Sequence, residues 1–460
     1  MSRPKIKIED LFELPTAEIF NPDSFSSSSF VSTDTRTIKK NSIFVALKGK
    51  KFDGHLFVEE AVKKGASVVV VNKKRLKDFD NVNVTIVTVK DTTKAYGDIA
   101  KIWHSKLNAK IVAISGSNGK TSTKEILTGI LSEKFKVTRT LANNNNHIGV
   151  PLTILETGSD TEVLVLELGT NHFGEIAYTS QIAKPEFALI TNIGESHLEF
   201  LQDLEGVAKE KISLFDETAK NGGIIFLNTD DKILKKKAKN YKNLVSFGFN
   251  DKAEVKGKII DLKDGKTIVQ VTYKDKSFKV NLPVYGLTNA KNFLASAAIA
   301  LKLGMSFKQI KQGAESLSSV KNRLNVKNFD KFSLVNDTYN ANPLSMRSAF
   351  EFIGSFQNRK RKIVVLGDMF ELGKQASSAH KELADSLKKN KITEVYTIGK
   401  LMRLLNNELV DKKITAKHFT NRDKLGAFLS DYNFDDSVVL FKGSRGMKME
   451  EFVKVIDKEM

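Results

Sequence analysis

Residues 110–122 read KIVAISGSNGKTS and join an apolar run to a glycine-rich turn. The run IVAIS has the composition of a buried strand, and the apolar residues from Ile126 to Phe135 recur at helical spacing. Glycines let the backbone approach a ligand closely, and successive N–H groups at a helix N-terminus can surround a phosphate. The sequence therefore predicts a strand, a phosphate-binding loop and a helix, in that order.

The end of this loop carries residue types that indicate nucleotide chemistry. Lys120 is placed to reach the β- and γ-phosphates of ATP, and the hydroxyl of Thr121 is placed to bind Mg²⁺. The loop is shorter than G-x-x-x-x-G-K-[ST], because Ile114 stands where the first glycine would be, and an ordinary glycine-rich turn is the alternative. We expect the nucleotide to contact Gly116, Ser117, Asn118, Gly119, Lys120, Thr121 and Ser122.

Apolar runs alternate with helical patterns along most of the chain. The expected strands lie at residues 42–47, 67–71, 163–168, 188–193, 223–227, 332–335, 362–366, 394–398 and 437–441. An antiparallel hairpin is expected around Asp264 and Gly265, before an alanine-rich helix at 289–303. This alternation is typical of parallel sheets in α/β proteins. At about 150 residues per domain, 460 residues suggest three domains, which we place at 1–106, 107–320 and 321–460.

The composition limits the classes of partner. The formal net charge of +19 is compatible with nucleic-acid binding, but the lysines are spread along the chain and no basic stripe is interleaved with aromatic residues. We therefore expect a solvated basic surface and no nucleic-acid partner. The chain has no cysteine, which excludes disulfides and thiolate metal sites. We find no apolar leader segment and no run of about 18 apolar residues, so we expect a cytoplasmic protein without membrane insertion.

Seven further motifs accompany the short phosphate loop. They are NNNNHIGVP from Asn143, VLELGTNHFGEI from Val165, TNIGESHLEF from Thr191, VAKEKISLF from Val207, NDTYNANPLSM from Asn336, LGDMFELG from Leu366 and FKGSRGMKME from Phe441. Together they resemble the Mur ligases, and within that family the branch that adds D-alanyl-D-alanine. The similarity runs from the segment STDTR at Ser32 to the C-terminal helix.

The resemblance implies a three-domain Mur ligase architecture. An N-terminal α/β domain would hold a UDP-sugar, a central P-loop ATPase domain would contain a parallel sheet, and a C-terminal Rossmann-like α/β domain would close on the nucleotide and bind the incoming dipeptide. The implied reaction is ATP-dependent amide ligation. D-alanyl-D-alanine would be joined to UDP-N-acetylmuramoyl-tripeptide through an acyl phosphate, in peptidoglycan precursor synthesis, by a monomer.

Three residues resemble the family's metal ligands. Glu167 ends an apolar run, so its carboxylate is expected at the C-terminal edge of a parallel sheet, and hard cations prefer such oxygen donors. His197 follows the expected strand 188–193, and the resemblance implies that it binds a second Mg²⁺ ion. By its spacing alone Lys211 is predicted to be a surface lysine, whereas the resemblance implies a carbamylated lysine. The resemblance thus implies ATP, two Mg²⁺ sites, and catalytic roles for Lys120, Glu167, His197 and Lys211.

Four residues are candidates for contacts with the rest of the nucleotide. The amides of Asn289 and Asn292 could read the adenine edge through paired donors and acceptors, although Asn289 could instead cap its helix. Arg323 resembles an arginine that contacts the terminal phosphate after domain closure, and Asp337 resembles a ribose-binding acid. Without the resemblance, a surface salt-bridge pair is an equally good interpretation of these two residues.

The remaining candidates are implied by the resemblance to contact the sugar nucleotide, the muramyl peptide or the triphosphate edge. By themselves these polar loops are typical of solvated surface. The candidates are Thr33, Asp34 and Arg36 for the sugar nucleotide, Asn144, Asn145 and His147 for the peptide, and Asn171 and His172 beside the triphosphate.

Two alternatives remain open at this point. One is another amide ligase of the same superfamily, either the diamino-acid-adding Mur ligase or a folylpolyglutamate synthetase-like enzyme, and Asp368, Glu371 and residues 143–151 bear on that choice. The other is a P-loop nucleotide switch or a nucleic-acid-stimulated ATPase, which the basic charge alone favours.

Overall fold

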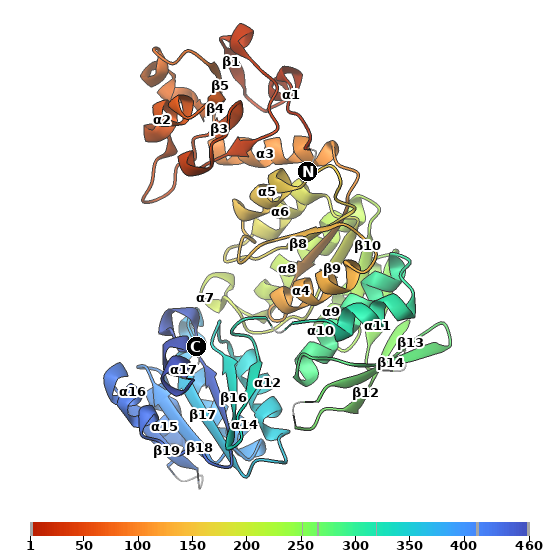
Figure 1. Cartoon of the computed structure of the whole chain (residues 1–460), viewed down its shortest axis with the longest axis vertical. Coiled ribbons are helices and arrows are strands. Elements are labelled where there is room, and N and C mark those ends of the chain that lie inside the picture. Colours follow the sequence, from red (N-terminus) through yellow and green to blue (C-terminus); the bar gives the residue numbers. More distant parts are fainter. Residues whose placement is uncertain (1–2, 251, 265, 319, 411–413, 458–460) are drawn as a thin grey trace. The chain divides into compact units, whose positions relative to one another are not determined.

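The computed structural model describes residues 3–250, 252–264, 266–318, 320–410 and 414–457. Within these residues the strands form three sheets, of five, nine and six strands (Figure 1). Helices alternate with the strands in each part of the chain. The predicted mixed α/β architecture with three sheets is therefore confirmed.

The first sheet is built from residues 18–89. Its strand order is β1-β5-β4-β3-β2, and every pairing is parallel except that of β1 with β5. The strands are β1 (Glu18–Phe20), β2 (Val31–Ser32), β3 (Ser42–Val45), β4 (Ala66–Asn72) and β5 (Thr85–Val89). The valine-rich β4 lies in the middle of the sheet, and most of its side chains are therefore buried, as in other parallel sheets. Helix α2 (Val58–Lys63) connects β3 to β4, and α3 (Thr92–Ser105) follows β5.

The nine-stranded sheet has the order β14-β13-β12-β11-β10-β9-β6-β8-β7. The strands are β6 (Lys110–Ser115), β7 (Val137–Arg139), β8 (Val163–Glu167), β9 (Phe187–Ile190), β10 (Ile224–Asn228), β11 (Leu244–Gly248), β12 (Val255–Asp261), β13 (Ile268–Tyr273) and β14 (Lys276–Asn281). The antiparallel pairing of β12 with β13 confirms the predicted hairpin, although Gly265 of its turn lies outside the described residues. Strand β9 ends at Ile190 rather than the predicted Ile193, because the chain after Ile190 leaves the sheet and bonds the phosphate loop.

Helices alternate with these strands, and α4 (Lys120–Leu131) begins at the end of the phosphate loop. The others include α7 (Leu198–Leu201), α8 (Leu204–Lys220), α10 (Gly286–Lys302) and α11 (Phe307–Glu315). Helix α10 begins at Gly286, before the predicted Asn289, because the chain is extended only as far as Tyr285. Among the described residues, we find no helix that combines the length and the apolar composition needed to cross a membrane.

The third sheet is built from residues 325–442 in the order β15-β16-β20-β17-β18-β19. Its strands are β15 (Asn325–Asn328), β16 (Phe332–Asp337), β17 (Arg361–Gly367), β18 (Glu394–Ile398), β19 (Thr415–Phe419) and β20 (Ser437–Lys442). All pairings are parallel except β15 with β16. Helices α12 (Pro343–Gly354), α13 (Ala376–Lys381), α14 (Leu383–Lys389), α15 (Met402–Glu408), α16 (Arg422–Ser430) and α17 (Glu450–Ile456) follow these strands.

The chain forms two compact units. The first contains the residues up to Ala113 together with Phe135–Thr170 and Glu175–Glu186. The second contains Ile114–Lys134, Asn171–Gly174 and the residues from Phe187 onward. This division differs from the three sequence-based domains, so their boundaries at 106 and 320 stay a prediction.

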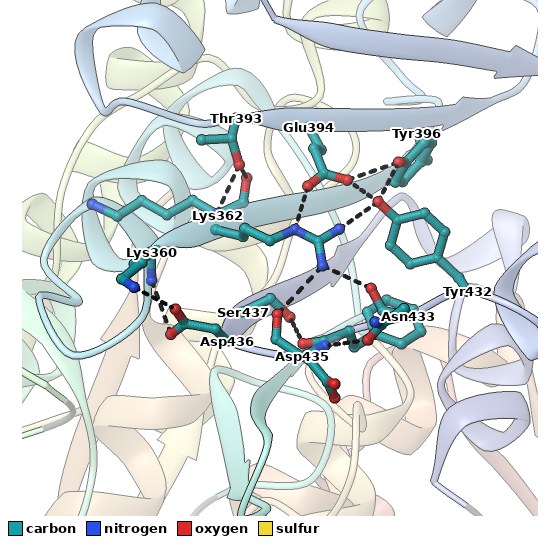
Figure 2. Close-up of polar contacts among 12 residues, drawn as sticks. Lys360, Lys362, Thr393, Glu394, Tyr396, Tyr432, Asn433, Asp435, Asp436 and Ser437 are labelled. Atoms are coloured by element: carbon teal, nitrogen blue, oxygen red, sulfur yellow. Dashed lines mark hydrogen bonds and ion pairs between the residues drawn. The ribbon is translucent and has the colours of Figure 1, made fainter.

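A polar network stabilises the third sheet at the N-terminal ends of its strands. The Arg361 guanidinium donates to Glu394 (2.8 Å) and to the Tyr432 hydroxyl (2.7 Å), and the Tyr396 hydroxyl donates to Glu394 (2.8 Å). Figure 2 shows Glu394, Tyr396 and Tyr432 gathered around this contact. Burial alone would raise the pKa of Glu394, but the Arg361 and tyrosine donors outweigh it and lower that pKa. Ligands of parallel sheets bind at the opposite, C-terminal edge, so this network has a structural role.

Removing this carboxylate is expected to destabilise the fold. Glu394→Ala should lower the free energy of unfolding by about 2 kcal/mol, because it leaves a partly buried guanidinium and two hydroxyls without their acceptor. Lys360→Ala is the matched control, since its side chain is 90% exposed and its ammonium lies 3.7 Å from Asp436. Urea unfolding measures both variants. Equal effects of the two substitutions would contradict the structural role of the network.

Candidate active site

Two glycines give the phosphate loop its shape between β6 and α4. Gly116 has φ +141° and Gly119 has φ +83°, both in the region that favours glycine. A Cβ on Gly116 would lie 1.9 Å from Thr191 Oγ1, and one on Gly119 would lie 2.6 Å from Asn292 Oδ1. Close packing therefore requires glycine at both positions, and it brings the amide of Asn292 against the loop.

The segment after β9 holds the middle of the loop. The Ser117 N–H donates to the Asn192 carbonyl (3.0 Å), and the Ser117 hydroxyl donates to the Gly194 carbonyl (2.8 Å). The Asn118 N–H donates to the Asn192 side chain (3.1 Å), and the Asn118 carbonyl accepts from Thr191 Oγ1 (2.5 Å). The loop backbone is thus held through hydrogen bonds from residues that sequence reasoning did not single out.

Lys120 and Thr121 begin helix α4 at the end of the loop. The Lys120 ammonium donates to the Gly116 carbonyl (2.7 Å), so its side chain folds over the loop. Arg323 Nη2 donates to Thr121 Oγ1 (3.1 Å), although 202 residues separate the two in the chain. The Arg323 guanidinium also lies 4.0 Å from the centre of the Tyr339 ring, which orients it by a cation–π contact. The structure therefore brings Arg323 to the loop.

Asp337 lies at the end of β16 and is held by two donors. Its Oδ1 accepts from the Leu324 N–H (3.2 Å), and its Oδ2 accepts from the Lys442 ammonium (2.5 Å). Lys442 is buried at the end of β20 and also donates to the Asn340 carbonyl (3.0 Å). The Asp337 carboxylate is therefore fixed beside Leu324, which follows Arg323 in the chain.

The two asparagines of α10 lie close together. Asn292 Nδ2 donates to Asn289 Oδ1 (3.4 Å), and Asn289 Nδ2 donates to the Tyr285 carbonyl (2.9 Å). Asn289 also lines a pocket together with Ser122 and Arg323. The complete lining is Ser122, Glu125, Ile126, Val284, Asn289, Ser318, Val320, Arg323 and Leu324. Asn289 does not cap its helix, since the N-cap is Tyr285.

His197 precedes α7 in a left-handed conformation, with φ +53°. Its Nδ1 lies 2.7 Å from Glu371 Oε2. The contact with His197 lowers the pKa of Glu371, and partial desolvation of this exposed side chain opposes the shift. The Glu371 carbonyl also accepts from the Glu199 N–H (3.1 Å). The LGDMFELG segment therefore contacts the predicted metal ligand.

Lys211 is buried on α8, with a relative exposure of 1%. Burial lowers the pKa of its ammonium well below the usual range, and the positive charge of Lys120 lowers it further, whereas Glu210 opposes the shift. Glu210 itself accepts from the Gly174 N–H (2.7 Å). The surface position suggested by spacing alone is therefore wrong, because this face of α8 packs inward. A lowered pKa increases the fraction of neutral amine, which is the nucleophilic form of lysine.

Glu167 belongs to the first unit and is buried at the end of β8. Its Oε1 accepts from Asn145 Nδ2 (2.9 Å), and its N–H donates to the Thr140 hydroxyl (3.0 Å). The backbone of Asn144 packs against Gly149, where a Cβ would lie 2.4 Å from the Asn144 carbonyl carbon. Asn145 thus contacts the carboxylate that the sequence assigned to metal binding.

The segment that the resemblance assigns to sugar-nucleotide binding contains Thr33 and Asp34 and also lies in the first unit. Asp34 caps a short 3₁₀ helix, and Arg36 Nη2 donates to Asp34 Oδ2 (2.6 Å). Hydrogen bonds from Arg36 lower the pKa of Asp34 to about 2. The Arg36 side chain is 84% exposed, so its guanidinium is accessible to an anion.

The comparison with known families explains this combination of features. Models of the Mur ligase family, catalytic domain, the Mur ligase middle domain and the Mur ligase, glutamate ligase domain match residues 27–104, 114–300 and 322–445. The chain belongs to the Mur ligase family. It is 33% identical over 427 residues to UDP-N-acetylmuramoyl-tripeptide–D-alanyl-D-alanine ligase of Bacillus subtilis, which covers 92% of each protein.

Solved Mur ligase structures share the same fold. A crystal structure of MurF from Acinetobacter baumannii has a TM-score of 0.89 and 29% sequence identity, and it covers 100% of both chains. The MurF ligase of Thermotoga maritima in complex with ADP has a TM-score of 0.84 and 29% identity, covering 94% of this chain and 97% of that one. ATP use by this Mur ligase is supported by that ADP complex.

The candidate site residues belong partly to one unit and partly to the other. The second unit contains the phosphate loop with Lys120 and Thr121, and also His197, Lys211, Asn289, Asn292, Arg323 and Asp337. It also contains Asn171 and His172, which are exposed, and the His172 ring lies 4.8 Å from that of Phe200. The first unit contains Thr33, Asp34, Arg36, Asn144, Asn145, His147 and Glu167. His147 is partly exposed.

The donor chemistry of this Mur ligase fits Mg²⁺ only in part. Thr121 and Glu167 offer hard oxygen ligands at a helix start and a strand end. Among the described residues, no group of three histidine, cysteine or acidic side chains is placed to hold a metal. Further oxygens would therefore come from the nucleotide phosphates, and from Lys211 if its neutral amine is carbamylated.

Sequence reasoning missed several partners of the predicted residues. They are Asn192, Tyr339, Asn342 and Lys442, although the motifs quoted for the resemblance contain all four. A usable signal was present: each except Lys442, which ends β20, follows a buried strand within a few residues. In parallel sheets ligand-binding side chains gather at that edge.

Proposed function

We propose that this chain is the ATP-dependent ligase that joins D-alanyl-D-alanine to UDP-N-acetylmuramoyl-tripeptide in peptidoglycan precursor synthesis. The relatives that carry this name, at 33% identity over 92% of the chain, support the substrate pair. The structural observation that carries the ATP-dependent reaction is the 3.1 Å contact between Arg323 and Thr121, which adds an arginine to the phosphate loop. The ligase forms a C–N bond, and we propose that it acts as a cytoplasmic monomer.

The reaction proceeds in two steps. The terminal carboxylate of the tripeptide attacks the γ-phosphorus of ATP, which forms an acyl phosphate and releases ADP. The dipeptide amine then attacks the acyl carbon, loses a proton, and releases inorganic phosphate. Lys120 and Arg323 neutralise the charge on the transferring phosphoryl group, and the N–H groups of residues 116–122 hold the phosphates.

Lys211 supplies an anionic ligand in this proposal. Its neutral amine attacks CO₂, a C–N bond forms, and one proton leaves, so a potential cation becomes a carbamate anion. The lowered pKa of Lys211 supports this step, because the free amine is the reactive form. Thr121, Glu167, His197 and the carbamate would hold two Mg²⁺ ions, which supply charge neutralisation for phosphoryl transfer.

The other candidate residues have binding roles. Asn289 and Asn292 contact the adenine, and Asp337 accepts from the ribose hydroxyls. Thr33, Asp34 and Arg36 bind the sugar nucleotide, where the exposed guanidinium suits a phosphate. Asn144, Asn145 and His147 contact the muramyl peptide, whereas Asn171 and His172 lie at the triphosphate edge.

A coupled ADP-release assay tests the proposed function. We expect turnover with UDP-N-acetylmuramoyl-tripeptide only when D-alanyl-D-alanine is present. Replacing the dipeptide with a diamino acid or glutamate, together with the matching acceptor, distinguishes the two superfamily alternatives. Polynucleotide is added as a further arm. Turnover with those substrates, or stimulation by polynucleotide, would contradict the proposal.

Arg323→Ala is expected to lower kcat more than it weakens ATP binding. The guanidinium acts on charge that develops during phosphoryl transfer, so kcat should fall about 10²-fold to 10³-fold while the Kd for ATP changes much less. Stopped-flow ADP release and calorimetry measure the two quantities. Arg422→Ala is the control, because Arg422 of α16 pairs with Glu451 of α17 (2.8 Å) and is not a candidate site residue. An unchanged kcat with weakened ATP binding would contradict this role.

A further inference from the structure

Two asparagine amides face each other between the phosphate loop and helix α12. Asn342 Nδ2 donates to Asn118 Oδ1 (2.9 Å), and Asn118 Nδ2 donates to Asn342 Oδ1 (3.2 Å). The two residues are 224 positions apart in the chain. Such a reciprocal pair satisfies a donor and an acceptor on each side chain, so it is specific for two amides.

The orientation of the Asn342 amide follows from its own helix. Asn342 is the N-cap of α12, and its Oδ1 accepts from the Ser345 N–H (2.8 Å). An oxygen is required at that position, so the Nδ2 group must point toward Asn118. The Ser345 hydroxyl accepts from the Asn342 N–H (3.0 Å) and completes a capping box. Helix α12 therefore presents a fixed amide to the phosphate loop.

The first turns of α12 make further contacts with the same region. Arg347 Nη2 donates to Glu195 Oε2 (2.9 Å). Leu344 packs against Gly194, where an added Cβ would lie 2.7 Å from Leu344 Cδ2. The Gly194 carbonyl also accepts a hydrogen bond from the Ser117 hydroxyl of the loop (2.8 Å). Residues 342–347 thus contact both the phosphate loop and the segment that supports it.

Asn118 is held from both sides. Its backbone N–H donates to the Asn192 side chain, and its carbonyl accepts from the side chains of Thr191 and Asn192. These hydrogen bonds fix the peptide planes on both sides of Asn118. Its side chain is bonded by Asn342. The direction in which the loop N–H groups point therefore depends on Asn342, the N-cap of α12. Phosphate binding to such a loop is sensitive to that direction, because the donors must converge on the anion.

We propose that Asn342 is a positioning residue for the phosphate loop, because its amide holds the Asn118 side chain through a reciprocal pair of hydrogen bonds. This inference rests on the proposed function, since it assumes that the loop binds ATP. Asn342 acts through Asn118 and does not touch the nucleotide. The triphosphate is bound tightly only while the amide pair is formed.

Asn342→Ser tests the proposal, because serine also caps helices but is too short to reach Asn118. We expect kcat/KM for ATP to fall about 10-fold to 30-fold, the effect of losing two neutral hydrogen bonds. The melting temperature should stay close to that of the control. Asn421→Ser is the matched control, since the Asn421 side chain caps α16 by accepting from the N–H groups of Asp423 and Lys424. We expect this substitution to leave kcat/KM unchanged. An Asn342→Ser enzyme with wild-type kcat/KM would overturn the proposal.

A double-mutant cycle with Asn118→Ala separates positioning from a general structural effect. The proposal expects the double variant to be no worse than Asn118→Ala alone, because both changes remove the same pair. Additive losses would overturn it. Calorimetry with a non-hydrolysable ATP analogue distinguishes this failure from failure of the proposed function. If the wild-type protein does not bind the analogue, the proposed function fails; if it binds and Asn342→Ser binds equally well, only the positioning role fails.

Discussion

Lys211→Ala is expected to abolish ligation, with kcat lowered at least about 10³-fold, while the fold is retained. The substitution removes the only amine on this face of α8 that the proposal converts into an anionic ligand, and phosphoryl transfer then lacks part of its charge neutralisation. Lys209→Ala is the matched control, because Lys209 lies two residues earlier on the same helix and is exposed. Steady-state ADP release and a melting curve measure both effects.

Chemical rescue distinguishes a carbamate from other roles of Lys211. Short carboxylates such as formate or acetate should restore part of the activity of Lys211→Ala, because they can fill the vacated position with an anionic oxygen. A ¹³C signal from labelled CO₂ should appear in the wild-type protein and be absent from the variant. The carbamate role would have to be abandoned if Lys211→Ala kept near-normal turnover, or if the labelled signal did not depend on Lys211.

Lys120→Ala is expected to remove turnover without weakening the binding of UDP-N-acetylmuramoyl-tripeptide. Lys120 begins α4 and folds over the phosphate loop, so its ammonium serves the ATP phosphates, and we expect kcat to fall about 10³-fold or more. Calorimetry measures ATP and sugar-nucleotide binding separately. Lys110→Ala provides the control, since Lys110 is exposed at the start of β6. A parallel loss of affinity for both ligands would show that the two binding sites are not separate.

Most central strands could be predicted from local patterns. The expected strand at 394–398 coincides with β18, and the expected strand at 437–441 differs from β20 by one residue. These strands are buried on both faces, so apolar and other strand-favouring residues dominate them. Strands β7, β15 and β19 were not predicted, since they lie at sheet edges, where half-exposed positions weaken the apolar pattern.

The phosphate loop could also be predicted, because all its determinants are local. Gly116, Gly119, Lys120 and Thr121 lie within six consecutive residues, and each has a role that follows from its type. The burial of Lys211 could not be predicted in the same way. A helical pattern shows which residues share a face, but the burial of that face depends on what the rest of the chain packs against it.

By itself, the sequence determined the α/β class, the order of the central strands and helices, and the glycine-rich loop for which we propose phosphate binding. These properties depend on the apolar pattern and residue types of short segments. Only the tertiary structure decided that Asn342 pairs with Asn118, that Glu371 contacts His197, and that Lys442 holds Asp337. Each of these pairs joins residues more than 100 positions apart, and such a pairing leaves no periodicity in the chain. Asp337 and Lys442 meet because β16 and β20 are parallel neighbours that end at the same edge of the third sheet. The other two pairs join a loop of the nine-stranded sheet to a loop of the third sheet, so they depend on how those two parts of the chain pack.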